Sequence, residues 1–586
     1  MTLLQWFVFF LIVQIVHFIG TWKMYEAAGR KRWEAAIPVY NAIVLMKIIN
    51  RPTWWTILLF VPVVNLIMFP VVWVETLRSF GKNSTLDTVL GIITFGFYTY
   101  YISYTKELNY ISDRSLIPKN AVADTISSFL FAIVVATIVH TYLIQPFTIP
   151  TSSLEKSLLV GDFLFVSKFN YGARTPMTAV ALPMVHDTIP IVHKKSYMSW
   201  PQLPYFRFPG YQKIERNDIV VFNWPVDTVY FFRDLSGRHV DKPIDKKSNY
   251  VKRCVGVAGD SLQIKDGDVF INGKQLILPE RARPQYSYSA KIKPTEGIDY
   301  QNLFNELNDY KADRGGFVDN ENLYFPAITD EMSIKLKNTY GVYDVKRNIS
   351  KSDSIYSYEF TFNPKIKDDE FLNMISRIKQ SQRFYVNEME GNRIYIHNLK
   401  SEFVDILKKQ KSVIKVKEIY EIFPHNFKQK NWTVDNFGPI YIPQEGKTVQ
   451  LNAETLPFYK RIITEYEGNN LKINGNEIRI NDKIATSYTF KQNYYWMMGD
   501  NRHNSEDSRF WGFVPQNHVV GKPIFIWMSI SGINDGIKNW RIRWDRLFTT
   551  VGGDGQPYSY FKFFLIALAA YFGISYFVEK RKEKKE

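Results

Sequence analysis

The chain has 586 residues, of which 46% are hydrophobic, and a formal net charge of +16. Its single cysteine, Cys254, excludes an intrachain disulfide, and no HExxH motif or Cys/His pairing with metal-ligand spacing occurs. We therefore expect no metal site and no cofactor. The basic residues border apolar segments and form no zinc-knuckle or basic-helix pattern, which favours a membrane surface and argues against nucleic acid as a partner.

Apolar stretches gather near the two ends of the chain. A helix that crosses a bilayer needs about 20 mostly apolar residues. The first such stretch lacks a basic leading segment and a small-residue cleavage site, so it is interpreted as a retained helix and not as a cleaved signal. Five windows are predicted to cross the membrane: residues 3–21, 54–74, 88–105, 122–145 and 558–577.

Basic clusters predict the direction of these crossings, because Lys and Arg concentrate on the cytoplasmic side. One cluster lies between the first two windows and another follows the last. The N-terminus is then outside, the C-terminus cytoplasmic, and residues 146–557 outside, although this arrangement also places Arg78 and Lys82 outside. The two clusters are Lys23, Arg30, Lys31, Arg32, Lys47 and Arg51, and Lys580, Arg581, Lys582, Lys584 and Lys585.

The polar middle of the chain has short runs of β-branched and alternating residues between Gly, Asn and Asp turns, which predict a β-rich domain. Residues 275–433 are more charged and include helix-like pieces such as residues 300–312, so they are interpreted as an inserted α+β lobe. No internal repeat is expected. The predicted parts are 1–121 (three membrane helices and an interfacial segment), 122–145 (a membrane helix), 146–274 and 434–550 (the two halves of a core), 275–433 (the lobe) and 558–577 (a last membrane helix with a basic tail).

The first candidate for chemistry follows the fourth window directly. Residues Ser153 to Lys156 match S-x-x-K, the acylating motif of penicillin-binding proteins and β-lactamases. Those enzymes also need S-x-N and K-T-G elements, and the sequence contains neither. A penicillin-type acyl-enzyme is therefore the disfavoured interpretation of this motif.

A second candidate is Lys252, which lies among apolar neighbours in YVKRCVGVAGD. A lysine acts as a general base only when it is neutral near working pH, which requires burial, a nearby cation such as Arg253, or both. The alternative is an ordinary strand lysine that points to solvent.

The third candidate is a dense polar cluster between strongly apolar flanks. Such a cluster is either a solvated turn or a buried hydrogen-bond network that organises a site, and the flanks favour the network. Its members are Asp500, Asn501, Arg502, Ser505, Asp507, Ser508 and Arg509.

Together the three segments resemble the bacterial type I signal peptidases. The resemblance rests on IPTSSLEKSLLVGDFLFVSKFNYG (149–172), YVKRCVGVAGD (250–260) and MMGDNRHNSEDSRFWGFVP (497–515), the last being close to the family's G-D-N-x-x-N-S-x-D-S-R box. It implies a multi-pass protein of the bacterial cytoplasmic membrane with a mainly β, signal-peptidase-like catalytic domain on the extracytoplasmic side. It also implies a serine endopeptidase that removes signal peptides through an acyl-enzyme.

The resemblance also assigns roles to residues. The nucleophile would be Ser153 and the general base Lys252, while the backbone N–H of Ser153 and the hydroxyl of Thr151 would form the oxyanion hole. Ser505 would orient the lysine. The polar loop would be held in shape by Asp507, Arg509 and Arg253, and pockets for small side chains would be lined by Phe147, Ile149, Leu158, Tyr250 and Val251. The implied partners are preproteins with A-x-A-type signal peptides, the lipid bilayer and the secretion machinery.

Two departures from the family pattern bear on these roles. The family commonly has Met-x-Pro-Thr after the nucleophile, whereas this chain reads Leu-Glu-Lys-Ser over residues 154–157, without the proline. His503 stands where Asp is frequent, so a Ser–His mechanism is open beside the simpler interpretation of a polar loop histidine. A non-enzymatic envelope scaffold, with the 275–433 lobe as its binding surface, is a further alternative.

Overall fold

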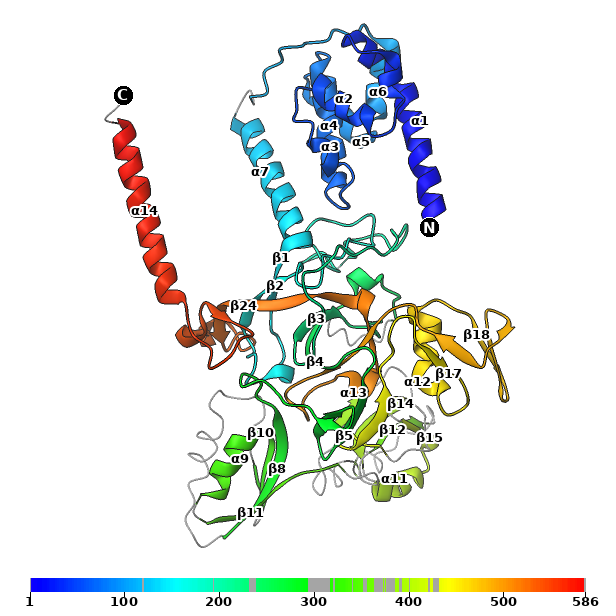
Figure 1. The fold of residues 1–586 in the computed structure, drawn as a ribbon, viewed down its shortest axis with the longest axis vertical. Helices are drawn as coiled ribbons and strands as arrows, with labels where there is room; N and C mark the ends of the chain where they lie inside the picture. The colour runs from blue at the N-terminus through cyan, green and yellow to red at the C-terminus, as the bar shows by residue number, and fades with distance from the viewer. Residues whose placement is uncertain are drawn as a thin grey trace. The chain divides into compact units, whose positions relative to one another are not determined.

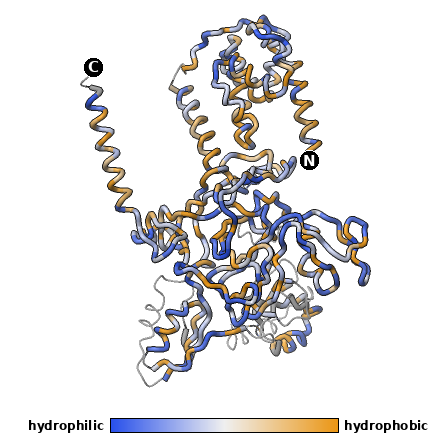
Figure 2. The backbone as a smooth tube through the Cα atoms, viewed as in Figure 1, coloured by the Kyte–Doolittle hydropathy of each residue, from blue (hydrophilic) through white to orange (hydrophobic). Residues whose placement is uncertain are grey.

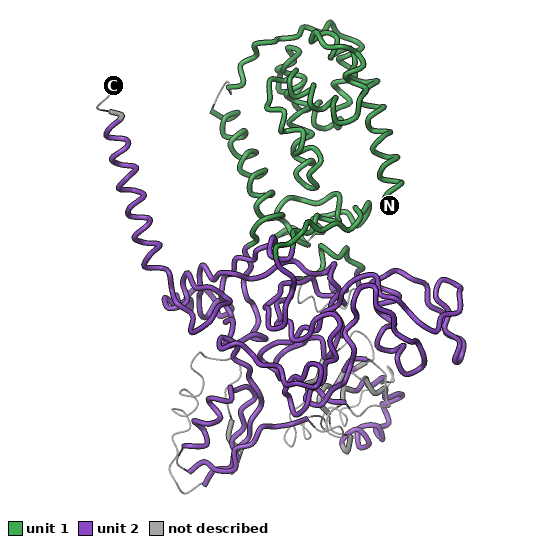
Figure 3. Tube along the Cα trace, in the orientation of Figure 1, with its two compact units in different colours: residues 1–145, 172–211, 241–248 green, residues 146–171, 212–240, 249–586 purple. Residues whose placement is uncertain are grey.

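The computed structural model divides the chain into two compact units, described separately here (Figure 3). The first comprises residues 1–145, 172–211 and 241–248, and the second comprises residues 146–171, 212–240 and 249–586. The predicted helical piece at 300–312 lies outside the described residues. Those are residues 2–583 without 118–120, 193, 231–238, 294–316, 320–321, 340, 351–355, 363–372, 374, 376–384, 389–392, 400, 420–421 and 425–431.

Three helices in the described parts of the chain are long and apolar enough to cross a membrane, and they coincide with three of the five predicted windows. They are α1 (Leu3–Ala27), α7 (Ala121–Ile138, continued by a π-helical turn to Leu143) and α14 (Phe561–Glu583). Most of their length is apolar in Figure 2, and little of it is buried within the protein.

The other two predicted windows are not continuous helices, so the prediction of five spanning helices is not confirmed. Residues 54–74 contain α3 (Trp55–Leu58) and the start of α4 (Asn65–Ser79), separated by a turn in which Val63 has a φ of 69°. Residues 88–105 contain most of α5 (Thr85–Ile93) and α6 (Phe97–Thr105), separated at Gly96. Gly96 has a φ of 83°, and a Cβ there would lie 2.6 Å from the Trp73 indole, so glycine is required at this break. Each window is therefore part of an apolar helical hairpin.

The hairpins share one hydrophobic core with α1 and α2 (Tyr40–Ile48), and α1 and α6 lie side by side (Figure 1). The predicted interfacial segment near residue 40 is part of this core, because Val44, Met46 and Ile48 of α2 are buried. At the tip of the α3–α4 hairpin, Phe60 packs against Phe10 of α1 with ring centroids 6.3 Å apart. Phe10 is 17 residues before the end of α1, which corresponds to about 25 Å along a helix.

The second unit is built on a nine-stranded sheet whose pairs are antiparallel, with the order β1-β2-β24-β3-β4-β22-β23 and with β25 and β26 paired to β24. The β-rich prediction for this domain is confirmed. Strand β4 lies between β3 and β22, so its residues are in the interior of the sheet. The strands are β1 (Ile144–Thr148), β2 (Asp162–Ser167), β3 (Ile219–Asn223), β4 (Asn249–Gly256), β22 (Tyr494–Met498), β23 (Val514–Pro515), β24 (Val519–Ser531), β25 (Arg541–Ile542) and β26 (Thr549–Thr550).

Smaller sheets extend this domain around a core that contains Trp496 and Phe437. One has the order β16-β5-β6-β7, another β18-β19-β20, and β17 pairs with β21. Their elements are β5 (Ser261–Lys265), β6 (Asp268–Ile271), β7 (Lys274–Gln275), β16 (Phe437–Tyr441), β17 (Thr448–Gln450), α12 (Leu456–Arg461), β18 (Leu471–Asn474), β19 (Glu477–Ile480), β20 (Lys483–Ile484), β21 (Ser487–Thr489) and α13 (Ser508–Trp511).

Residues 285–419 form two four-stranded modules with the same topology. The first has the strand order β11-β8-β10-β9 and the second β15-β12-β14-β13, and in each a helix connects the third strand to the fourth. The expectation of no internal repeat is therefore wrong at the level of topology. The elements are β8 (Gln285–Ile292), β9 (Phe317–Asp319), β10 (Asn322–Thr329), α9 (Asp330–Lys337) and β11 (Val342–Arg347), and then β12 (Tyr356–Phe362), β13 (Tyr385–Glu388), β14 (Arg393–Leu399), α11 (Ser401–Lys408) and β15 (Val413–Ile419).

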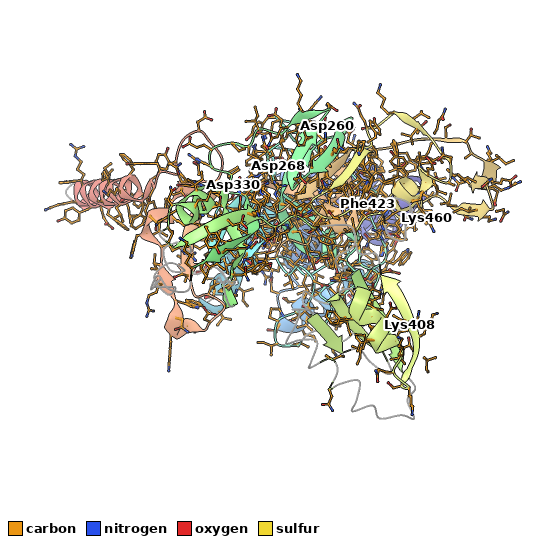
Figure 4. All side chains as sticks on the ribbon, turned by 90° about the horizontal axis from the view of Figure 1, so that it is seen from below. Asp260, Asp268, Asp330, Lys408, Phe423 and Lys460 are labelled. Carbon is orange, nitrogen blue, oxygen red and sulfur yellow. The ribbon has the colours of Figure 1, made fainter. Side chains whose placement is uncertain are left out.

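The first module is fastened to the β5–β6 hairpin by a partly exposed arginine, Arg347 of β11. The Arg347 guanidinium stacks 3.7 Å from the centroid of the Tyr286 ring and donates hydrogen bonds to Asp268 of β6 and Asp330 of α9. Figure 4 labels the two carboxylates, one from strand β6 and the other from helix α9. The module is thus held against the domain by charge-assisted hydrogen bonds as well as by chain connection.

Candidate active site

The predicted nucleophile and base meet in the structure. Ser153 lies in a short 3₁₀ turn (Ser152–Leu154) between β1 and β2, and Lys252 lies in β4 opposite Val220 of β3. The Lys252 Nζ is 2.6 Å from the Ser153 Oγ, which is hydrogen-bond distance for a base and a nucleophile. The two residues are 99 positions apart in the sequence, and the sheet brings them together.

Burial of Lys252 changes the pKa of its ammonium group. The Lys252 side chain is 3% exposed and forms no ion pair among the described residues. Burial lowers the pKa of Lys252 to about 8, with the nearby Asp507 and Glu506 acting to raise it and Arg509 to lower it. At pH 7 about one molecule in ten then holds a neutral amine. The alternative of a solvent-facing strand lysine is wrong.

Asparagine side chains of the 499–509 loop fix the turn that holds the nucleophile. The backbone N–H of Asn501 donates to the Ser153 carbonyl at 3.0 Å, and its side-chain amide donates to the Ser152 carbonyl at 3.1 Å. Asn504 donates to the Ser152 hydroxyl at 2.7 Å. Ser152 therefore takes part in the contacts that hold the turn in place.

Arg253 and Asp500 form a buried ion pair beside the dyad. The Arg253 guanidinium donates two hydrogen bonds to Asp500, at 2.8 and 2.6 Å, and a third to the Asn217 carbonyl. The Ser157 hydroxyl, from the end of the nucleophile turn, donates to the same carboxylate. Burial alone would raise the pKa of Asp500, but the Arg253 charge and these hydrogen bonds hold the pKa below its ordinary value. Asp500 therefore remains an anion that links the turn to β4.

Asp507 and Arg509 form a second buried pair that shapes the loop. Asp507 begins α13 as its N-cap and accepts hydrogen bonds from the Arg509 guanidinium at 2.8 Å and from the Gly499 backbone N–H at 3.1 Å. Arg509 also donates to the Arg502 carbonyl. The predicted network of Asp507, Arg509 and Arg253 is thus present as two compensated ion pairs, and the solvated-turn alternative is wrong.

Ser505 and Thr151 lie close to the dyad, but their predicted roles are not seen as hydrogen bonds. A Cβ on Gly499 would collide with both the Ser505 hydroxyl and the Ser153 carbonyl, so these two groups are packed over the same glycine. The Ser505 hydroxyl is buried and has no hydrogen-bond partner among the described residues. Thr151 is in extended conformation directly before the turn. Orientation of Lys252 by Ser505, and an oxyanion contact from Thr151, remain predictions.

His503 is hydrogen-bonded through both ring nitrogens to groups outside the dyad. Its Nδ1 accepts a hydrogen bond from the Ser287 backbone N–H at 3.0 Å, so the proton lies on Nε2, which donates to Asp435 at 2.9 Å. Burial would raise the pKa of Asp435, but its hydrogen bond and charge interaction with His503 lower it. This arrangement favours a structural histidine over a Ser–His mechanism.

Four of the five predicted pocket residues fall in one hydrophobic cluster. Ile149 and Leu158 are buried there, with Phe147 and Val251 at its partly exposed edge. Tyr250 belongs instead to the neighbouring cluster, where it stacks on Trp224 at 5.1 Å. The pocket residues therefore gather beside the nucleophile turn, except for Tyr250, which lies under the Lys252 ammonium with its ring centroid 5.5 Å from Nζ.

Sequence reasoning did not single out Gln285, whose buried side chain donates to the Glu155 carbonyl of the nucleophile turn. Gln285 belongs to no recognisable motif, because it lies in the predicted inserted lobe, 130 residues after Glu155. Asn501 and Asn504 were recognisable as part of the polar box, but their contacts to Ser152 and Ser153 were not. No group of three or more His, Cys, Asp or Glu among the described residues is arranged to hold a metal ion.

A serine hydroxyl, a buried lysine of lowered pKa and a surrounding hydrogen-bonded loop define a serine–lysine hydrolase type of site. Comparison with known proteins agrees with this class. The family model described as "Signal peptidase, peptidase S26" matches residues 122–327 and 383–528, more than half of the chain. The chain belongs to this signal peptidase family and is a serine endopeptidase. The resemblance seen in the sequence is confirmed.

Individual relatives carry the same description. The chain is 24% identical to "Signal peptidase I" of Helicobacter pylori (73% of this chain, 92% of the relative). It is 22% identical to that of Buchnera aphidicola subsp. Baizongia pistaciae (70% and 77%) and 23% identical to that of Rickettsia massiliae (46% and 90%). Residues 33–113, which hold the apolar hairpins, match a separate family of unknown function, DUF5684.

Proposed function

We propose that the chain removes signal peptides from exported preproteins with Ser153 as nucleophile and Lys252 as general base. The observation that carries this proposal is the 2.6 Å contact between the Lys252 Nζ and the Ser153 Oγ, in a site where the lysine is buried without a counter-ion among the described residues. Neutral Lys252 accepts the hydroxyl proton as Ser153 Oγ attacks the scissile carbonyl carbon.

The reaction then proceeds by acyl transfer. The tetrahedral oxyanion receives hydrogen bonds from the Ser153 backbone N–H and from the Thr151 hydroxyl, donors that contribute about 3–4 kcal/mol each in comparable sites. Protonated Lys252 gives its proton to the leaving amine, and the new N-terminus departs. Water, deprotonated by the same lysine, hydrolyses the Ser153 ester and restores the free enzyme.

The substrate proposal follows from the cluster beside the turn. A signal peptide has a small-residue A-x-A-like site directly after an apolar segment. Ile149, Leu158 and Val251 offer an apolar lining that suits alanine-sized side chains. Ser153 follows the end of the α7 π-turn at Leu143 by ten residues, which keeps the nucleophile near the membrane surface by chain connection. Delivery of substrates by the secretion machinery belongs to this proposal.

A topology with three membrane crossings places the two termini and the polar domain on the same sides of the membrane as the predicted five crossings do. The Trp6 indole, near the start of α1, donates to the Gln202 carbonyl at 2.9 Å, which supports an N-terminus on the side of the polar segment 172–211. The loop after α1 and the tail after α14 are basic and would be cytoplasmic. The hairpins then enter the bilayer from the cytoplasmic side and return, so Arg78 and Lys82 become cytoplasmic in agreement with the charge rule.

Single-cysteine labelling tests this topology, because the natural Cys254 is buried. Asn83→Cys places a thiol in the exposed α4–α5 loop, and Lys538→Cys places one in the exposed polar domain. An impermeant maleimide added outside intact spheroplasts should label Lys538→Cys only, and should label Asn83→Cys only after the membrane is opened. Outside labelling of Asn83→Cys would restore five crossings.

The catalytic proposal is tested by cleavage of an A-x-A-type preprotein in liposomes. The wild type should cleave at the signal junction, and Ser153→Ala and Lys252→Ala should lose about a thousandfold or more in rate while keeping the wild-type thermal midpoint. Lys156→Ala should remain active, since Lys156 would be essential only to a penicillin-type S-x-x-K enzyme. An inactive wild type would favour the scaffold alternative. An active Ser153→Ala variant would show that another residue is the nucleophile.

A further inference from the structure

The turn after the nucleophile has a backbone conformation that proline cannot adopt. Lys156, which occupies the position of the proline in the family pattern, has a φ of 70°. The proline ring fixes φ near −65°, so a proline here would force a different turn. The turn of this chain is closed instead by hydrogen bonds from the Ser157 and Leu158 N–H groups to the Leu154 carbonyl. Its rigidity must come from contacts outside the turn.

Gln285 supplies such a contact from the first strand of the first module. Its side-chain amide donates to the Glu155 carbonyl at 2.9 Å, at the end of the 3₁₀ turn that contains Ser153. The Gln285 side chain is buried, and its Oε1 has no hydrogen-bond partner among the described residues. Among the described residues, the side-chain amide of Gln285 therefore bonds to the nucleophile turn alone.

The backbone of Gln285 is itself fastened to the catalytic loop. Its N–H donates to the Asp500 carbonyl at 2.8 Å, and its carbonyl accepts from the Arg502 N–H at 3.0 Å, in a parallel bridge with Asn501. Gln285 thus joins the two parts of the site that approach Ser153, the turn on one side and the 499–509 loop on the other. Nearby, the Arg283 N–H donates to the Ser157 hydroxyl, which supports the same junction.

We propose that Gln285 is a positioning residue for the nucleophile, and that it provides the turn rigidity that a proline cannot provide here. This inference rests on the proposed Ser153–Lys252 mechanism. Gln285 touches neither the substrate nor the dyad, and acts by holding the Glu155 carbonyl and hence the direction of the Ser153 side chain. A misplacement of about 1 Å at a reacting group lowers the rate by about a hundredfold.

The first test is Gln285→Met, which keeps side-chain length and removes the donor, with Lys291→Met at the exposed end of the same strand as control. Gln285→Met should lower kcat on the preprotein about 10- to 100-fold, leave KM within about threefold, and leave the acid limb of the pH profile unchanged because Lys252 keeps its surroundings. Lys291→Met should match the wild type. A kcat within twofold of wild type for Gln285→Met would overturn the inference.

If Gln285→Met lowers the thermal midpoint, a second pair of variants tests whether activity depends on the backbone conformation of the turn. Lys156→Pro should lose activity about a hundredfold, because its φ is inaccessible, whereas Lys156→Gly should stay within about threefold of wild type. Equal activity of the two variants would overturn the inference.

The rate of Ser153 labelling by a fluorophosphonate separates this inference from the proposed function. Slower labelling in Gln285→Met supports positioning even where preprotein cleavage is absent, while a wild type that labels but never cleaves the preprotein contradicts the signal peptidase function alone.

Discussion

The buried cation of the dyad lacks a counter-ion among the described residues, whereas the buried cations Arg253 and Arg509 near it are paired with carboxylates. Lys252 is buried against Ser153 with one 2.6 Å contact and no ion pair among the described residues. Its neighbour Arg253 is equally buried but meets Asp500 through two hydrogen bonds, and Arg509 meets Asp507 in the same manner. Adjacent residues of β4 therefore have opposite electrostatic surroundings.

The difference explains which cation can take part in catalysis. An uncompensated buried ammonium loses stability relative to the neutral amine, so its pKa falls and it can accept a proton. A guanidinium in a paired site keeps its charge and fixes geometry. The loop carboxylates compensate the arginines, and Lys252 is left to titrate near pH 8.

The largest expected effect comes from giving Lys252 a permanent charge. Lys252→Arg keeps a long cationic donor near Ser153 but cannot supply a neutral base, because the arginine pKa exceeds 12. We expect a loss of about a thousandfold in kcat/KM for preprotein cleavage, comparable to Lys252→Ala. Activity within tenfold of wild type would show that charge, and not basicity, is the contribution of this lysine.

Removing a compensating carboxylate should affect stability most. Asp500→Asn leaves Arg253 buried without its anion, and breaking such a pair costs about 3–5 kcal/mol. The thermal midpoint of the detergent-solubilised protein should fall by several degrees, together with activity. Asp482→Asn is the matched control, since Asp482 forms a solvent-exposed ion pair with Lys472, and such pairs contribute little to stability. Equal thermal midpoints for the two variants would contradict the conclusion that the buried Arg253–Asp500 pair contributes more to stability than the exposed pair.

The pH dependence follows from the lowered pKa of Lys252. Neutral lysine is the active form, so kcat/KM should rise about tenfold per pH unit below pH 8 and level off above it. Because the folded pKa of about 8 lies below the ordinary 10.5, the folded state binds fewer protons between these values. The free energy of unfolding therefore gains from this group as pH rises through that range. A rate independent of pH from 6 to 9 would exclude Lys252 as the titrating base.

The smallest expected effect is a shift in the pKa of Lys252 when a nearby exposed charge is removed. The exposed Glu506 acts to raise the pKa of Lys252, so Glu506→Gln should move the acid limb to lower pH, by less than about one unit because solvent and salt screen an exposed charge. The exposed Glu445→Gln is the control. The pH profile is measured at low and high salt, and an upward shift would reverse the assigned sign.

The dyad was predictable because it lies in short local motifs. The resemblance to signal peptidases assigned Ser153 and Lys252 from these motifs. The polar box with its apolar flanks predicted a buried hydrogen-bond network, but not which of its residues form ion pairs. Gln285 could not be found in this way, since its role depends on how β8 pairs with the loop at Asn501, far away in the sequence. The same limit applies to His503, whose partners Ser287 and Asp435 are separated from it by 216 and 68 residues.

The membrane region shows a different limit of sequence reasoning. Hydropathy measures how apolar a window is and not whether its backbone turns within it. The windows at 54–74 and 88–105 are apolar enough to span, but turns at Val63 and Gly96 interrupt their helices. The proposed sidedness does not depend on this difference, because replacing two crossings by two hairpins leaves the number of crossings odd.

The repeated module has a consequence for how this enzyme can change over time. In each copy the first strand pairs with the last, β8 with β11 and β12 with β15, so the chain enters and leaves a copy through neighbouring strands. A unit with adjacent ends can be gained, lost or exchanged at a loop without altering the register of the host sheet. We therefore expect the host sheet to tolerate loss or exchange of the copy at 356–419 better than that of the copy beginning at Gln285, whose side chain contacts the nucleophile turn.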